Sequence, residues 1–192
     1  LVSARYGIDP GIPWLLAVGM MRPGPKLDSY RVIGAALPKI TNTAWHLIVA
    51  GDGPMRDEVT RLLPQERTTM AGLCDDDTLA TLYAASDLLI WPAVREGYGM
   101  AILEAQCAGL PAVVGHTPGV AAIVADGTTG RVVRNGDAGA FAAAIDELLL
   151  DTSRRHHMSA AARSKIRREH DIASAALVLD NAISSLSCTT SS

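Results

Sequence analysis

Short, largely apolar runs constrain the fold of this 192-residue chain more than any other feature of its sequence. An unbroken apolar run is typical of a parallel strand buried on both faces, whereas a half-exposed strand alternates apolar and polar residues. Each run is followed by turn residues and then by a segment long enough for a helix. The runs occupy residues 14–18, 46–50, 68–71, 88–91, 112–114 and 131–133.

This alternation predicts an α/β fold: a doubly wound, parallel, six-stranded Rossmann-like sheet with helices on both faces. Ligands bind such sheets at the carboxyl ends of the strands, where the strand order reverses. We expect that point between the first and fourth strands. Helices are expected at residues 27–37, 55–63, 78–85, 100–108, 118–125 and 136–150, followed by two C-terminal helices at 153–168 and 173–186.

The length and the pattern together favour one domain. We expect a Rossmann-like domain over residues 14–186, with a linker leading into it at 1–13 and a polar tail at 187–192. The linker is expected because two prolines and two glycines interrupt a segment without periodicity. The chain starts at Leu1 without Met and shows no signal peptide, which is compatible with a start inside a longer protein.

Composition excludes several classes of protein. The formal net charge of −3 gives no basic surface for nucleic acid, so nucleic acid is not an expected partner. No apolar run approaches the roughly 20 residues of a membrane-spanning helix. Cys74, Cys107 and Cys188 are odd in number and form no CxxC pair, so neither a disulfide framework nor a zinc site is indicated. That pattern favours a cytoplasmic protein.

The stretch at residues 95–111, REGYGMAILEAQCAGLP, is the main candidate site. A strand, a glycine-bearing turn and a helix beginning near Met100 aim backbone N–H groups and a helix dipole at an anion. Glu96 precedes that helix, and Glu104 lies about one turn inside it, on the same face as Met100. Because a carboxylate repels phosphate, Glu96 and Glu104 are better matched to hydroxyls on either side of a diphosphate.

Each of these residues also has an ordinary structural interpretation. Glu104 taken alone is a solvated surface charge, while Gly97 and Gly99 can serve only the turn. The ordered set of strand, glycines and two carboxylates favours a ligand site over these separate explanations.

That ordered set resembles a known family. Glu96, seven intervening residues, Glu104-Ala105, Ala108-Gly109-Leu110-Pro111 and a Val-rich run are similar to the signature of retaining nucleotide-sugar glycosyltransferases of family four, the glycosyl transferases group 1, with a GT-B fold. The resemblance implies that Glu96 contacts the transferred sugar and Glu104 the ribose hydroxyls. It also implies that the diphosphate is bound by the backbone of Gly97, Tyr98, Gly99, Met100 and Ala101.

The resemblance covers about residues 14–170 and corresponds to the C-terminal donor-binding domain of a GT-B enzyme. The N-terminal acceptor domain is absent from this chain. The resemblance further implies that backbone near Gly72 and Leu73 faces the nucleobase. The family usually carries a Glu at the position of Ala122, which this chain lacks.

The loop after the first strand supplies two cations. Lys26 and Arg22 lie where a ligand would meet the carboxyl end of that strand. In the family an Arg follows the strand directly and a Lys comes five residues later, both on the diphosphate. Here Met20 occupies the Arg position, so the match is shifted, and Lys26 is the better candidate. The alternative is that both are solvated loop charges.

Three further features have competing interpretations. Residues 75–77, three aspartates, resemble a metal-binding cluster but are explained more simply as a helix start, and we expect no metal and no cofactor. His116 lies in a loop facing the site, although a lone His is usually structural. The basic helix at 153–168 is either a solvated face or a peripheral contact with anionic lipid.

The sequence therefore predicts the donor domain of a hexosyltransferase-type enzyme that moves a sugar from a UDP- or GDP-sugar to an acceptor. The isolated chain is expected to be inactive. The alternative is a non-catalytic nucleotide-binding Rossmann module. A phosphorylase or epimerase of the same fold is a third interpretation.

Overall fold

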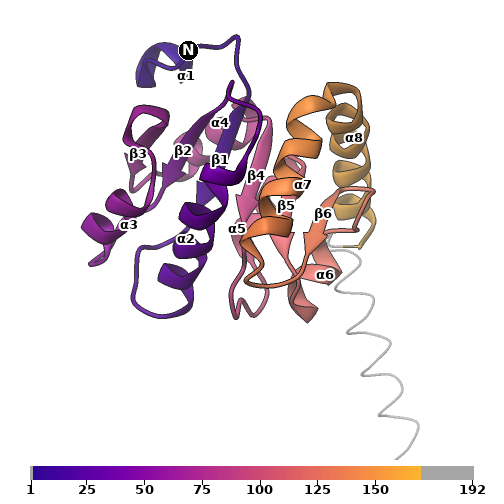
Figure 1. Cartoon of the computed structure of the whole chain (residues 1–192). Helices are drawn as coiled ribbons and strands as arrows, with labels where there is room; N and C mark the ends of the chain where they lie inside the picture. Colours follow the sequence, from indigo (N-terminus) through magenta and orange to yellow (C-terminus); the bar gives the residue numbers. More distant parts are fainter. Residues whose placement is uncertain (1, 170–192) are drawn as a thin grey trace, which may run out of the picture.

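The computed structural model describes residues 2–169, which form one parallel sheet with helices on both faces (Figure 1). The strands are hydrogen-bonded in the order β3-β2-β1-β4-β5-β6, and every neighbouring pair is parallel. The reversal of strand order at β1 and β4 confirms the predicted switch point. The strands are β1 (Trp14–Val18), β2 (His46–Ala50), β3 (Thr68–Gly72), β4 (Leu88–Trp91), β5 (Ala112–Gly115) and β6 (Gly130–Val133).

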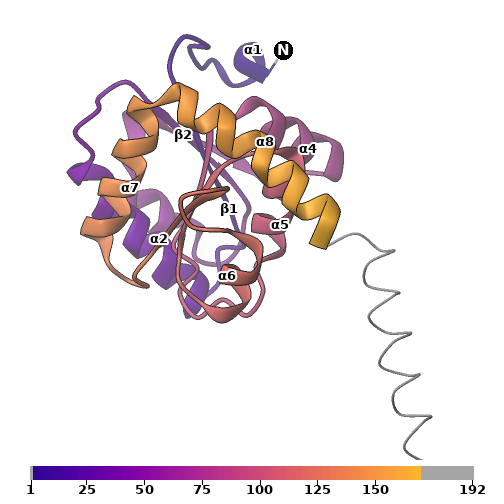
Figure 2. The ribbon, with the colours of Figure 1, turned by 90° about the vertical axis from the view of Figure 1, so that its right-hand side faces the viewer.

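The helices form a layer on each side of the sheet. Figure 2 shows α2 and α7 on one side and α4, α5 and α8 on the other. The helices are α1 (Val2–Tyr6), α2 (Pro25–Ala36), α3 (Arg56–Leu62), α4 (Asp76–Ala85), α5 (Met100–Ala108), α6 (Pro118–Ile123), α7 (Ala138–Leu150) and α8 (Thr152–Glu169), with 3-10 turns η1 (Leu37–Lys39) and η2 (Gln65–Arg67).

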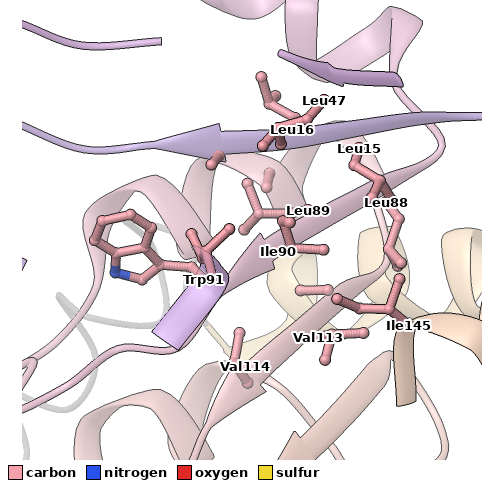
Figure 3. Close-up of a cluster of buried hydrophobic side chains, with 14 of the residues drawn as sticks. Leu15, Leu16, Leu47, Leu88, Leu89, Ile90, Trp91, Val113, Val114 and Ile145 are labelled. Atoms are coloured by element: carbon pink, nitrogen blue, oxygen red, sulfur yellow. The ribbon is translucent and has the colours of Figure 1, made fainter. Parts of the chain in front are cut away.

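The core lies between the sheet and both helical layers. Leu16, Leu89 and Val113 come from three adjacent strands and, like Ile145 of α7, are fully buried (Figure 3). Burial on both faces explains why these strands read as continuous apolar runs. The paired strands are therefore a rigid base for the loops at their carboxyl ends.

The expected strands and most expected helices are confirmed, with boundaries shifted by a few residues. One correction concerns residues 1–13, expected as a linker, in which Val2–Tyr6 form the short helix α1. The helix stops at Gly7, whose φ of +66° suits glycine, and the prolines that suggested a linker come after it. The predicted helix at residues 173–186 and the tail at 187–192 lie outside the described residues.

Within the described part of the chain, none of the helices is both long and apolar enough to span a bilayer.

Candidate functional site

A cleft of about 520 Å³ opens at the carboxyl ends of β1, β2 and β4. It occupies the switch point at which ligand binding is expected in a doubly wound sheet. Backbone and side chains of several loops and helices form its wall. The lining residues are Val18, Gly19, Met20, Lys26, Ala50, Gly51, Leu73, Cys74, Leu79, Trp91, Glu96, Gly97, Tyr98, Gly99, Met100, Ala101 and Ile102.

The loop between β4 and α5 has an unusual backbone. Ala93 and Arg95 adopt φ values of +52° and +51°, which are rarely seen for residues other than glycine. The neighbouring elements hold the loop in this shape: the Val94 N–H donates to Ser29 Oγ at 3.0 Å, and Asn135 Nδ2 donates to the Ala93 carbonyl at 3.1 Å. The loop is therefore fixed before any ligand arrives.

Two glycines are required to place this loop over α5. Gly99, the N-cap of α5, has φ +90° and ψ +61°, a left-handed conformation that a Cβ disfavours. Gly119 in α6 packs so closely that a Cβ there would lie 1.9 Å from the Gly97 carbonyl oxygen. Any larger residue at position 119 would push the loop away from α6.

The first turn of α5 faces the cleft without a side-chain cap. The Gly99 carbonyl accepts from the amides of Ile102 and Leu103, whereas the amides of Met100 and Ala101 precede the helical hydrogen-bond pattern. Such amides, together with the helix dipole, favour an anion. This end of α5 can therefore bind phosphate oxygens.

A charged pair lies near the N-terminus of α5. Lys26 Nζ lies 2.6 Å from Glu96 Oε2, with side-chain exposures of 36% and 18%. The same Glu96 oxygen accepts from Trp91 Nε1 at 3.2 Å, and Lys26 Nζ lies 5.2 Å from the centre of the Trp91 ring. Trp91 thus holds Glu96 independently of Lys26, which leaves the lysine able to turn to a phosphate.

Trp91 is itself held in place by Tyr30 of α2. The Tyr30 ring meets it edge-to-face with centroids 5.3 Å apart, and the Tyr30 hydroxyl donates to the Gly19 carbonyl at 2.7 Å. Burial raises the pKa of Tyr30, so its hydroxyl keeps its proton. Figure 3 shows the indole at the end of β4, beyond the aliphatic core. Trp91 therefore lines the cleft with its ring held by Tyr30, which is fully buried.

Glu104 lies in a second hollow, of about 530 Å³, beside the cleft. Leu79 lines both hollows, so they are neighbours. Glu104 is exposed, and its Oε2 accepts from the hydroxyl of buried Tyr83 at 2.9 Å. Glu96 thus lines the cleft, and Glu104 lines the neighbouring hollow.

The structure brings together most of the residues expected to bind the donor, and their roles remain predictions. Arg22 is exposed on its loop and does not line the cleft, and neither do Gly72 and His116. Asp75 Oδ1 accepts from the Thr78 amide at 2.8 Å, which confirms the helix-start interpretation of the aspartates. The expected residues that do line the cleft are Lys26, Leu73, Glu96, Gly97, Tyr98, Gly99, Met100 and Ala101.

Two residues of the site were missed by sequence reasoning. Pattern alone indicates Trp91 only as the end of a strand, although a tryptophan four residues before the motif is a usable signal. Tyr83 gave no signal, because its contact with Glu104 joins residues 21 positions apart through the packing of α4 on α5.

Comparison with known proteins identifies the family. The model of the glycosyl transferases group 1 matches residues 12–151, most of the chain. The chain belongs to this family. Of its relatives, the α-D-kanosaminyltransferase of Streptomyces kanamyceticus is 29% identical over 159 residues, which cover 81% of this chain and 41% of that protein.

Solved structures share the fold of this group 1 glycosyltransferase chain. A sucrose-phosphate synthase from Thermosynechococcus elongatus superposes with a TM-score of 0.82 at 22% identity, covering 98% of this chain and 49% of that one. Alr3699/HepE from Anabaena, in complex with UDP-glucose, gives 0.78 at 21% identity, covering 96% and 51%. The chain thus spans about half or less of these proteins. The Rossmann-like architecture with its GT-B neighbours confirms the expected fold class.

Proposed function

We propose that this chain is the donor-binding domain of a retaining glycosyltransferase that transfers a hexose from a UDP- or GDP-sugar to an acceptor. The observation that carries the proposal is the cleft at the switch point. There, the uncapped first turn of α5 lies beside the Lys26–Glu96 pair. An anion site flanked by a movable cation and two carboxylates suits a diphosphate that carries a sugar on each side.

In this proposal each group has one role. The amides of 97–101 bind the diphosphate, and Lys26 exchanges one Glu96 oxygen for phosphate oxygens. Glu96, still held by Trp91, faces the sugar. Glu104 accepts hydrogen bonds from the ribose hydroxyls. The apolar Leu73 side chain, 75% exposed at the rim, packs against the nucleobase. Arg22 reaches the diphosphate only if its loop moves, and is a secondary candidate.

The reaction requires little covalent chemistry from these residues. The bond between the anomeric carbon and the leaving phosphate oxygen breaks, the acceptor hydroxyl oxygen bonds to that carbon with the same configuration, and the hydroxyl proton passes to the leaving diphosphate. Negative charge grows on the diphosphate, where fixed amides and an ammonium stabilise it without reorganising. We expect no metal in this role, because Lys26 and the amides supply the positive charge.

One structural neighbour supports the choice of donor, and one relative supports sugar transfer. Alr3699/HepE from Anabaena forms a complex with UDP-glucose, and the Streptomyces relative is a sugar transferase by name. This chain covers 51% of the first and 41% of the second, which supports a separate acceptor-binding half. Cys74 and Cys107 are free thiols, in keeping with the proposed cytoplasmic setting.

Calorimetric titration of the 192-residue chain with UDP, GDP and ADP tests the donor class. We expect UDP or GDP to bind and to be displaced by the matching sugar nucleotide. Absence of binding by all three nucleotides would contradict the proposal.

A transfer assay separates an enzyme half from a binding-only module. Transfer requires an acceptor about 3–3.5 Å from the anomeric carbon, and we assign that geometry to a second domain. We expect the isolated chain to bind donor without transferring sugar, and a longer protein that carries an acceptor domain to transfer it. Comparable turnover by the isolated chain would show that the acceptor site lies within these residues. Binding without turnover in both would favour the non-catalytic module.

A further inference from the structure

Tyr83 and Glu104 connect α4 to α5 at the edge of the second hollow. The Tyr83 hydroxyl donates to Glu104 Oε2 at 2.9 Å, and Tyr83 is 4% exposed. Glu104 itself is exposed. A buried, rigid donor therefore holds one oxygen of a carboxylate that also reaches solvent.

We propose that Tyr83 is the positioning residue for the nucleotide ribose: its hydroxyl fixes the Glu104 carboxylate in the orientation that accepts from the ribose hydroxyls. This inference rests on the proposed function, in which Glu104 binds the ribose. In this proposal Tyr83 acts on the ribose through Glu104. Its role is to prepare Glu104.

Side-chain entropy gives Tyr83 this role. A glutamate side chain on a helix surface has three rotatable bonds, and ordering it at the moment of binding reduces affinity. The Tyr83 ring is already ordered by its burial between α4 and α5. The hydrogen bond from the Tyr83 hydroxyl to Oε2 therefore restricts the Glu104 side chain before the nucleotide binds.

The two carboxylates also differ in the charge of the group that holds them. Glu96 is paired with a lysine, whose positive charge compensates the carboxylate. Glu104 is held by a neutral hydroxyl instead, so its full negative charge stays available to polarised hydroxyl donors. Burial, and then the charge of Glu104, raise the pKa of Tyr83, so the hydroxyl keeps its proton and stays a donor at neutral pH.

The test measures ribose discrimination rather than affinity alone. Calorimetry gives the ratio of dissociation constants for 2′-deoxy-UDP and UDP, and the GDP pair is measured in parallel. The wild-type chain is expected to prefer the ribonucleotide about tenfold or more. Tyr83→Phe removes only the hydroxyl and is expected to lower that preference about threefold to tenfold.

Tyr30→Phe is the matched control. It removes a second buried hydroxyl near the cleft, one that donates to the Gly19 carbonyl and not to a carboxylate. The affinity of the Tyr30→Phe chain for both nucleotides can change, but the ratio of its dissociation constants for 2′-deoxy-UDP and UDP should not. In a Glu104→Ala background, Tyr83→Phe should have no further effect on the ratio, because the group that it orients is gone.

The outcomes separate the two claims. A wild-type chain with equal affinity for the deoxy- and ribonucleotides would contradict the ribose contact of Glu104, and the positioning role with it. Normal discrimination in the wild type that Tyr83→Phe leaves unchanged would overturn the positioning role alone. A loss of thermal stability in Tyr83→Phe with an unchanged ratio would assign the hydrogen bond to helix packing only.

Discussion

Two groups of helices begin differently in this molecule. Helices α4, α6 and α7 start at a side chain that accepts from a backbone amide, supplied by Asp75, Thr117 and Asp137. Helices α2, α3 and α5 start without such a cap. The uncapped helices follow β1, β2 and β4, which are adjacent in the sheet, whereas the capped ones follow β3, β5 and β6.

This difference separates the helices that are stabilised by a side-chain cap from the helices of the switch point, where we expect the ligand. A side-chain cap is worth about 1 kcal/mol. The helices that follow the outer strands have this contribution. The helices of the switch point lack it, and of these α2 and α5 line the cleft, through Lys26 and through the first turn of α5, which has no side-chain cap. Variants in each group of helices test whether the uncapped group serves ligand binding and the capped group serves stability.

Glu104→Ala should affect the central region most. The loss of a charge-assisted hydrogen bond to the ribose should weaken nucleotide binding by about 1.5–3 kcal/mol, about 10- to 150-fold. Calorimetry with UDP and GDP measures it. Glu66→Ala removes an exposed glutamate that does not line the cleft and serves as the control. Unchanged affinity in a folded Glu104→Ala chain would show that Glu104 is a solvated surface charge and not a ribose contact.

Lys26→Ala should weaken diphosphate binding about tenfold and monophosphate binding much less. The variant also leaves Glu96 without its counter-ion near the phosphates. Binding should become less sensitive to salt, because a screened attraction has been removed. Titrations of UDP and UMP at two salt concentrations test this, with Lys39→Ala, an exposed lysine outside the cleft, as control. A preserved preference for diphosphate would rule out the contact.

Asp137→Ala should affect an outer helix and leave the cleft alone. Asp137 Oδ1 accepts from the Ala140 amide at 2.9 Å at the start of α7. Its loss should destabilise the chain by about 0.5–2 kcal/mol, measured by urea unfolding. Nucleotide affinity should not change. A drop in affinity would show that the two groups of helices are coupled, and would weaken the comparison.

The smallest expected effect is a pH dependence outside the cleft. Burial lowers the pKa of His46, whose Nε2 lies 2.8 Å from Thr69 Oγ1. Because the folded pKa lies below the unfolded value near 6.5, the unfolded chain binds more protons beneath that pH. Stability should therefore fall as pH drops below about 6.5 and level off above it. In urea titrations, His46→Gln should flatten this dependence.

The sequence predicted the sheet better than the site. Strands such as β1 and β4 are buried on both faces, and this burial produces a run of apolar residues that can be read directly. The loop between β4 and α5 has no comparable signature. The left-handed backbone at Ala93 and Arg95 depends on Ser29 and Asn135, which reach it from other parts of the chain.

The same limit applies to individual side chains. The sequence correctly placed Glu96 ahead of α5 and Glu104 about one turn inside it, but it did not show that they lie in different hollows with different partners. Trp91 and Tyr83 acquire their contacts only after β4 and α4 pack beside α5. Local pattern gives the element on which a residue lies, and tertiary packing decides what the residue contacts.

A map of backbone amides during nucleotide titration tests the anion site at α5 most directly. Nitrogen-15 NMR of the full chain, titrated with the tightest-binding of UDP, GDP and ADP, would follow each amide separately. We expect the largest shifts at residues 97–101, where α5 begins without a cap, and negligible shifts at residues 137–140, where α7 begins with one. Nucleotide binding that leaves the amides of 97–101 unmoved would contradict the proposed site.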